Sequence, residues 1–263
     1  SIILAILVLI LGALLVHSRQ RLQQLQQTEA AKTEARRSAF ISIISHQLRT
    51  PLSIIKGYLE SLSAGDLGAL TDEQQEYADE ALHINRDTVK LVNDYLDAVK
   101  LDTETLAVSP EPVDLAAVVA EEIKRLTPLA QASNCELVFD KPDTPVPKVR
   151  ADLIKIKQVV ENTLTNAIKY IGGKGRATIT LADVGDRVRF SCADTGVGIP
   201  ADQQAELFTK FFRAKNVIGR HTTGSGLGLY LAKMIITALH GKIWIESTEG
   251  QGTTVYFELP KAE

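Results

Sequence analysis

The chain has 263 residues, of which 45% are hydrophobic, a composition that is typical of folded protein and argues against disorder. Its formal net charge of −3 provides no basic excess, so a nucleic-acid partner, whose phosphates a basic surface would have to offset, is not expected. The two cysteines, Cys135 and Cys192, show no metal-ligand spacing, and we expect both to be reduced residues of the core.

Residues 1–16 form an almost uninterrupted apolar run that ends at His17. A helix that crosses hydrocarbon needs about 20 apolar residues, so we expect a transmembrane helix whose start is truncated. The alternative is a signal peptide, which is less favoured because no small-residue cleavage pattern precedes a mature start. Lysine and arginine residues follow the run. The positive-inside tendency therefore predicts that residues 17–263 are cytoplasmic and that the chain is held in an inner or plasma membrane.

Helical sequence continues beyond this run. Residues 17–38 are predicted to form a helical linker, a short coiled coil, and residues 39–103 a helical hairpin. Apolar side chains recur at helical spacing over 40–62, a glycine-containing turn follows, and Thr71 with Gln74 three residues on is a typical start of the second helix. A lone hairpin cannot bury two apolar stripes, so we expect a homodimer that forms a four-helix bundle.

A proline-bearing stretch, residues 104–112, is the predicted linker to a second domain over 113–260. Helices are expected there near 115–131, 153–170 and 228–239, and strands near 136–140, 176–182, 187–193, 242–247 and 252–259. This order predicts a multidomain chain whose second domain is an α+β two-layer sandwich, with one layer of helices on an antiparallel sheet.

Three separated segments of the second domain carry residues suited to a nucleotide. The first is the predicted helix QVVENTLTNAIKY, where Asn162 and Asn166 are four residues apart and Lys169 is three further along the same side. An amide oxygen can bind Mg²⁺, and a lysine can meet a phosphate. Two asparagines on a helix are also common as solvated surface residues, so this segment alone leaves both interpretations open.

The second segment, DTGVGIP, follows an apolar strand. Asp194 leaves that strand into a turn with Gly196 and Gly198, so its carboxylate can accept a hydrogen bond from an amino group such as that of adenine. A simple loop with an aspartate cap is the alternative.

The third segment, GSGLGLYLAK, has glycines at positions 224, 226 and 228 that lead directly into an apolar helix. Backbone N–H groups at a helix start can hold phosphate oxygens. The segment matches neither a P-loop, which needs Gly-Lys-Ser or Gly-Lys-Thr, nor a dinucleotide fold, which needs a strand just before the glycines.

Together, in this order and spacing, the three segments resemble the N, G1 and G2 boxes of the histidine-kinase-type ATPase domain, the Bergerat fold. Residues 206–214 resemble its F box, and residues 213–223 its mobile ATP lid. The resemblance covers almost all of residues 113–260 and implies ATP as substrate and Mg²⁺ as cofactor. The nucleotide-binding positions that it implies are Asn162, Asn166, Lys169, Tyr170, Asp194, Gly196, Gly198, Gly224, Gly226, Leu227 and Gly228. By the same resemblance, Asn166 binds the Mg²⁺ ion and Asp194 recognises adenine.

Gyrase, mismatch-repair and chaperone ATPases share this fold, so the acceptor must be identified from the hairpin. Its octapeptide SHQLRTPL is similar to the H box of histidine kinases, with His46 as phosphoacceptor. This resemblance implies a sensor histidine kinase, which phosphorylates His46 from ATP and passes the phosphoryl group to an aspartate of a cytoplasmic response regulator. Thr50, one turn further, corresponds to a residue that can position water for dephosphorylating that regulator; a packing hydroxyl is the alternative.

One residue departs from the family. The position after the phosphoacceptor is typically acidic and is thought to take the imidazole proton, but here it is Gln47, whose amide has no basic lone pair at pH 7. Slower autophosphorylation, transfer of the proton to water, and a balance shifted toward phosphatase activity all remain open. Two rival functions follow: a degenerate transmitter that serves as a nucleotide-binding scaffold, and a phosphatase-dominant regulator that relies on Thr50.

Overall fold

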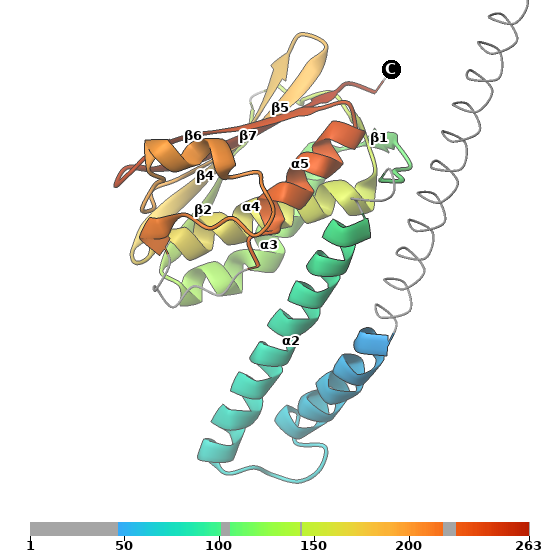
Figure 1. Ribbon diagram of the computed structural model, residues 1–263, viewed down its shortest axis with the longest axis vertical. Coiled ribbons are helices and arrows are strands. Elements are labelled where there is room, and N and C mark those ends of the chain that lie inside the picture. The colour runs from blue at the N-terminus through green and yellow to red at the C-terminus, as the bar shows by residue number, and fades with distance from the viewer. Residues whose placement is uncertain (1–46, 101–105, 143, 218–224, 263) are drawn as a thin grey trace, which may run out of the picture. The chain divides into compact units, whose positions relative to one another are not determined.

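The structure is a computed structural model that describes residues 47–100, 106–142, 144–217 and 225–262 (Figure 1). The chain folds into two compact units, and the boundary between them in the sequence lies between Val92 and Asn93. The expected transmembrane helix, the expected linker over 17–38 and His46 all fall outside the described residues. Within the ranges given above, no helix is both long enough and apolar enough to cross a membrane.

The first unit contains most of the predicted helical hairpin, and residues 93–100 at the end of its second helix belong to the second unit. Residues 47–63 are helical, and α2 (Asp72–Lys100) follows a turn in which Gly65 and Gly68 have positive φ angles. The predicted start of the second helix is confirmed, because the Thr71 N–H donates to Gln74 Oε1 at 3.0 Å and the Gln74 N–H donates to Thr71 Oγ1 at 3.3 Å.

Polar contacts hold the two helices of the hairpin side by side. Arg86 donates to Glu60 at 3.2 Å, and Gln75 Nε2 donates to the Ser63 carbonyl at 3.1 Å. Large apolar side chains nevertheless remain exposed on the hairpin, namely Leu48, Ile54, Ile55, Tyr58, Tyr77, Ile84 and Leu91. The last three recur every seven residues along α2, which leaves an uncovered apolar seam. A second copy of the chain would cover it, and the homodimer stays a prediction.

The second unit is built around a five-stranded sheet in the order β2-β4-β5-β7-β6. The strands are β2 (Cys135–Asp140), β4 (Gly175–Val184), β5 (Arg187–Asp194), β6 (Lys242–Thr248) and β7 (Gly252–Pro260). Three helices cover one face of this sheet (Figure 1): α3 (Leu115–Ala132), α4 (Leu153–Ile171) and α5 (Gly228–Ala238). The predicted two layers of helices and sheet are therefore present.

The expectation of an antiparallel sheet is wrong at one edge, because β2 pairs with β4 in parallel. The chain between these strands contains α4, and a crossover of this length returns it to the same end of the sheet. A further antiparallel pair, β1 (Glu111–Val113) with β3 (Val149–Ala151), was not predicted, since three-residue strands are too short to show alternation. The long predicted loop contains two short 3-10 helices, η1 (Ala201–Glu206) and η2 (Lys215–Val217).

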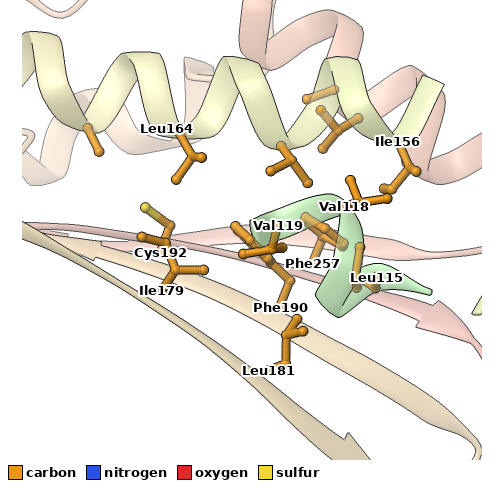
Figure 2. Packing of buried hydrophobic residues seen from close by; sticks show 14 of the residues in the cluster. Leu115, Val118, Val119, Ile156, Leu164, Ile179, Leu181, Phe190, Cys192 and Phe257 are labelled. Carbon is orange, nitrogen blue, oxygen red and sulfur yellow. The ribbon is translucent and has the colours of Figure 1, made fainter. Parts of the chain in front are cut away.

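The core lies between the helix layer and the sheet. Figure 2 shows Leu164 of α4 and Val119 of α3 above Ile179 of β4 and the aromatic rings of β5 and β7. Phe190 and Phe257 stack there with ring centroids 4.5 Å apart. Both cysteines are free and buried, as predicted. Burial raises the pKa of the Cys192 thiol, which therefore behaves as a small apolar core residue.

Candidate nucleotide-binding site

Helix α4 positions the first set of predicted residues. Asp152 caps its start by accepting from the Ile154 and Lys155 N–H groups at 3.1 Å, and Gly172 ends it with a φ of 68°. The apolar side of the helix is anchored in the core. The polar residues Asn162, Asn166 and Lys169 are half-buried, so they lie at the border between the core and the adjoining loops.

Asp194 ends β5, and one of its carboxylate oxygens is fixed by the backbone. Its Oδ1 accepts from the Gly196 N–H at 2.8 Å and from the Thr253 N–H at 3.2 Å. Its Oδ2 makes no hydrogen bond to any residue that the structure describes. Burial raises the pKa of this carboxyl group, and the two N–H donors counteract the rise. The free oxygen can therefore accept a hydrogen bond from a ligand amino group, as the sequence predicts for adenine.

Glycines hold the loop after Asp194 against its neighbours. A Cβ atom at Gly196 would lie 2.5 Å from the Tyr170 carbonyl oxygen. Gly198 has a φ of 62°, and a Cβ atom there would lie 2.0 Å from the Thr248 carbonyl oxygen. The Val197 N–H donates to the Tyr170 carbonyl at 3.1 Å. The loop thus joins the end of α4 on one side and the end of β6 on the other.

The start of α5 meets α4 at another predicted residue. A Cβ atom at Gly228 would lie 2.4 Å from Asn162 Oδ1, so the side chain of Asn162 packs directly against the backbone at the start of α5. Leu227, the residue before the helix, is buried, and no side chain caps the first turn of α5. The N–H groups of that turn are suited to an anion. Gly226 has a φ of 68° and packs against Phe211, and Gly224 falls outside the described residues.

Two basic residues lie near Tyr170 at the end of α4. The Lys169 ammonium is 5.1 Å from the centre of the Tyr170 ring. Burial raises the pKa of the Tyr170 hydroxyl, and the positive charge of Arg213 counteracts the rise. Arg213 is the next-to-last residue of the predicted F box. A cation from α4 and a cation from the predicted F box therefore both interact with Tyr170.

Gly252 and Thr253 contact Asp194 directly, and neither was among the predicted site residues. A glycine at the start of a strand can mark a close approach of two backbones, so Gly252 itself was the one signal in the sequence for this contact. In the hairpin, Gln47 and Thr50 are exposed helical residues on the turn before Pro51. Their assigned roles stay predictions.

Two family models match the chain. The model of a histidine kinase-, DNA gyrase B-, and HSP90-like ATPase matches residues 151–263, which contain all the predicted nucleotide-binding positions. The model of the His Kinase A (phospho-acceptor) domain matches residues 36–104, which contain His46.

Characterised proteins match over most of the chain. It is 34% identical over 234 residues to the circadian input-output histidine kinase CikA of Synechococcus elongatus. The aligned region covers 88% of this chain and 31% of CikA. It is 33% identical over 239 residues to the sensor protein kinase WalK of Staphylococcus aureus, covering 89% of this chain and 56% of that protein. The chain therefore spans only part of the length of these relatives.

Solved structures agree with the fold. Full-length ShkA in complex with AMPPNP is 28% identical with a TM-score of 0.70, covering 85% of this chain and 46% of ShkA. The nucleotide-free catalytic domain of the histidine kinase ThkA is 32% identical with a TM-score of 0.52, covering 59% of this chain and 97% of that domain.

Proposed function

The chain belongs to the histidine kinase family, and we propose that it transfers the γ-phosphoryl group of ATP to His46 and from there to an aspartate of a response regulator. The observation that carries the ATP half of this proposal is the geometry of Asp194, which has one oxygen fixed by two backbone N–H groups and the other available. The acceptor half is supported by the match of residues 36–104 to a phospho-acceptor domain.

Adenine recognition follows from the loop after β5. We propose that Asp194 Oδ2 accepts a hydrogen bond from the 6-amino group of adenine. Guanine has a carbonyl oxygen at that position, which cannot donate. Gly196 and Gly198 let the loop pack against the Tyr170 and Thr248 carbonyls, which holds the carboxylate of Asp194 in place. The polyphosphate then extends toward the first turn of α5, with Lys169 and Arg213 supplying positive charge.

A magnesium ion fits the donor groups at this site. Within the described residues there is no cluster of three or more His, Cys, Asp or Glu side chains that could hold a metal by itself. One amide oxygen, that of Asn166, suits Mg²⁺, which usually keeps waters and binds through substrate phosphates. When bound, the ion offsets the charge that develops on the transferred phosphoryl group. The side chain of Asn162 packs against the backbone at Gly228, and we propose that it supports Asn166 and the phosphate-binding turn.

The transfer itself uses the neutral imidazole of His46. A ring nitrogen with a free lone pair forms the bond to the γ-phosphorus as the bond from that phosphorus to the oxygen of the ADP leaving group breaks. The ring must then lose its N–H proton. Gln47 can accept a hydrogen bond from that group but cannot take the proton, so we propose that water takes it.

The remaining context is also proposed. Residues 1–16 would anchor the chain in a membrane with residues 17–263 in the cytoplasm. The apolar seam on α2 supports a homodimer. The response regulator would dock on the phosphorylated hairpin.

Gln47 favours a second candidate function. A transmitter that lacks a base beside the acceptor can bind nucleotide without transferring phosphate, or can act mainly as a phosphatase through the exposed Thr50. The full chain, incubated with γ-labelled ATP and Mg²⁺, separates these functions. Acid-labile label that disappears in His46→Gln is expected. ATP binding without label in the native chain would instead support the scaffold or the phosphatase.

A further inference from the structure

Polar side chains that are not part of the proposed nucleotide site hydrogen-bond to the loop over residues 194–200. We propose that Ser247 of β6 and Gln204 of η1 are positioning residues, which hold this loop in its adenine-binding conformation and thereby set the affinity for ATP. The inference rests on the proposed nucleotide site and adds two residues that do not touch the nucleotide.

The hydroxyl of Ser247 is fully engaged. It accepts from the Ile199 N–H at 2.9 Å, donates to the Gly252 carbonyl at 2.9 Å and lies 2.9 Å from Thr253 Oγ1. A serine hydroxyl has one donor and two acceptor sites, and these three contacts use all of them when Thr253 is the donor. Ser247 therefore links the far end of the loop to the start of β7.

Gln204 also binds the backbone of Ile199. Its amide nitrogen donates to the Ile199 carbonyl at 3.0 Å and to the Ser247 carbonyl at 2.9 Å, which uses both of its N–H groups. The N–H and the carbonyl of Ile199 are thus both bound by side chains. No backbone ladder of the sheet provides these bonds, so the position of Ile199 depends on these two residues.

The contacts of Ser247 lead directly to the adenine-binding carboxylate. Ser247 contacts Gly252 and Thr253, and the Thr253 N–H donates to Asp194 Oδ1 at 3.2 Å. Both ends of the loop, Asp194 and Ile199, are consequently tied to one short segment at the start of β7. Its middle is tied to the same hairpin, because the Gly250 N–H donates to the Val197 carbonyl at 2.8 Å.

These hydrogen bonds should affect the affinity for the nucleotide more than the rate of phosphoryl transfer. A loop of this length without regular secondary structure costs conformational entropy when a ligand orders it. Hydrogen bonds that order it in advance remove that cost from binding. The loop contacts adenine in the proposed site, whereas the reacting phosphate lies at the start of α5. Loss of the hydrogen bonds made by Ser247 and Gln204 should therefore weaken nucleotide binding without slowing phosphoryl transfer from bound ATP.

The test is titration of the full chain with ADP by calorimetry, beside autophosphorylation at varied ATP. Ser247→Ala and Gln204→Met each remove two or more hydrogen bonds, and each should raise the Kd for ADP and the KM for ATP about 5- to 30-fold, with kcat within about twofold of the native value. Ser247→Thr keeps the hydroxyl and should restore most of the affinity. Thermal unfolding identifies any variant that is misfolded.

Ser191→Ala is the matched control. The Ser191 hydroxyl pairs with Thr180 Oγ1 at 2.6 Å in the same sheet and makes no hydrogen bond to residues 194–200. The affinity of this variant for ADP should therefore stay native. Native ADP affinity in both Ser247→Ala and Gln204→Met would overturn the inference, as would a fall in kcat at an unchanged KM. A native chain that binds no ADP would overturn the proposed nucleotide site itself, and the inference with it.

Discussion

A Cβ atom at Gly252 would lie 2.0 Å from the carbonyl oxygen of Asp194, so the start of β7 lies directly against the end of β5. Only glycine permits this approach, and its φ of 108° is also one that other residues rarely adopt. The same approach brings the Thr253 N–H to the Asp194 carboxylate. The backbone of β7 therefore helps to position the carboxylate that we propose binds adenine.

The first prediction concerns this contact. Gly252→Ala should destabilise the domain by about 3 kcal/mol, because the methyl group meets backbone atoms that cannot move aside. Gly250→Ala is the matched control, since Gly250 also has a positive φ but has nothing within 4 Å of its Cβ position. It should cost about 1 kcal/mol. Urea unfolding measures both, and equal costs would contradict the steric explanation.

The second prediction concerns the charge on Asp194. Burial raises its pKa in the folded state, so the stability that the protonated form contributes is present at low pH and is lost as the pH rises through that pKa. At pH 7 the ionised group costs stability. Asp194→Asn should therefore raise the Tm of the nucleotide-free chain by about 2 to 5 °C and weaken ADP binding about 100-fold. Thermal scans between pH 4 and 8 should show the difference in Tm shrinking as the pH falls.

Asp152 provides the opposite case. Its burial would raise the pKa, but hydrogen bonds from the N–H groups of Ser109, Lys155 and Ile154 outweigh burial and lower it. A lowered pKa means that the stability is present above the ordinary pKa and is lost as the pH falls through the folded value. Asp152→Asn should thus lower the Tm at pH 7. A gain in Tm there would contradict the assignment.

The third prediction concerns Glu122 on α3, whose side chain is only 6% exposed and pairs with Arg125, which also pairs with Glu161 of α4 at 3.1 Å. Arg125→Met would leave the buried carboxylate without its partner, at a cost of about 3 kcal/mol. The exposed pair Arg176–Glu136 has side chains 58% and 60% exposed. Arg176→Met should cost under about 1 kcal/mol. Urea unfolding measures the free energy of unfolding of both variants. A similar loss in Arg125→Met and Arg176→Met would contradict a role for the burial of Glu122.

The fourth prediction concerns the proton of His46. Gln47→Glu introduces a carboxylate that can take this proton, and we expect the initial rate of autophosphorylation to rise about 100-fold. Gln47→Met matches the side-chain size without a carboxylate and should not show the gain. Rapid-quench labelling at saturating ATP measures the rates. An unchanged rate in Gln47→Glu would mean that proton removal does not limit the transfer.

Local patterns in the sequence were sufficient to predict most of the helices and strands and to name candidate site residues. The Thr71 cap, the spacing of Asn162 and Asn166, and Asp194 at the end of an apolar strand are each visible within a few residues. Short-range hydrogen bonding and alternating burial determine such features, so they can be read without knowledge of the fold. Prediction was weaker where only three residues form a strand, as in β1 and β3.

By itself, then, the sequence determined the helical hairpin, the helix and strand order of the second domain, and the residue types that suit ATP. Only the tertiary structure decided that β2 runs parallel to β4, that Thr253 donates to Asp194, and that Ser247 and Gln204 bind Ile199. The physical reason is sequence separation: Asp194 and Thr253 are 59 residues apart. Such partners meet through strand register and crossover direction, which depend on the packing of the whole domain.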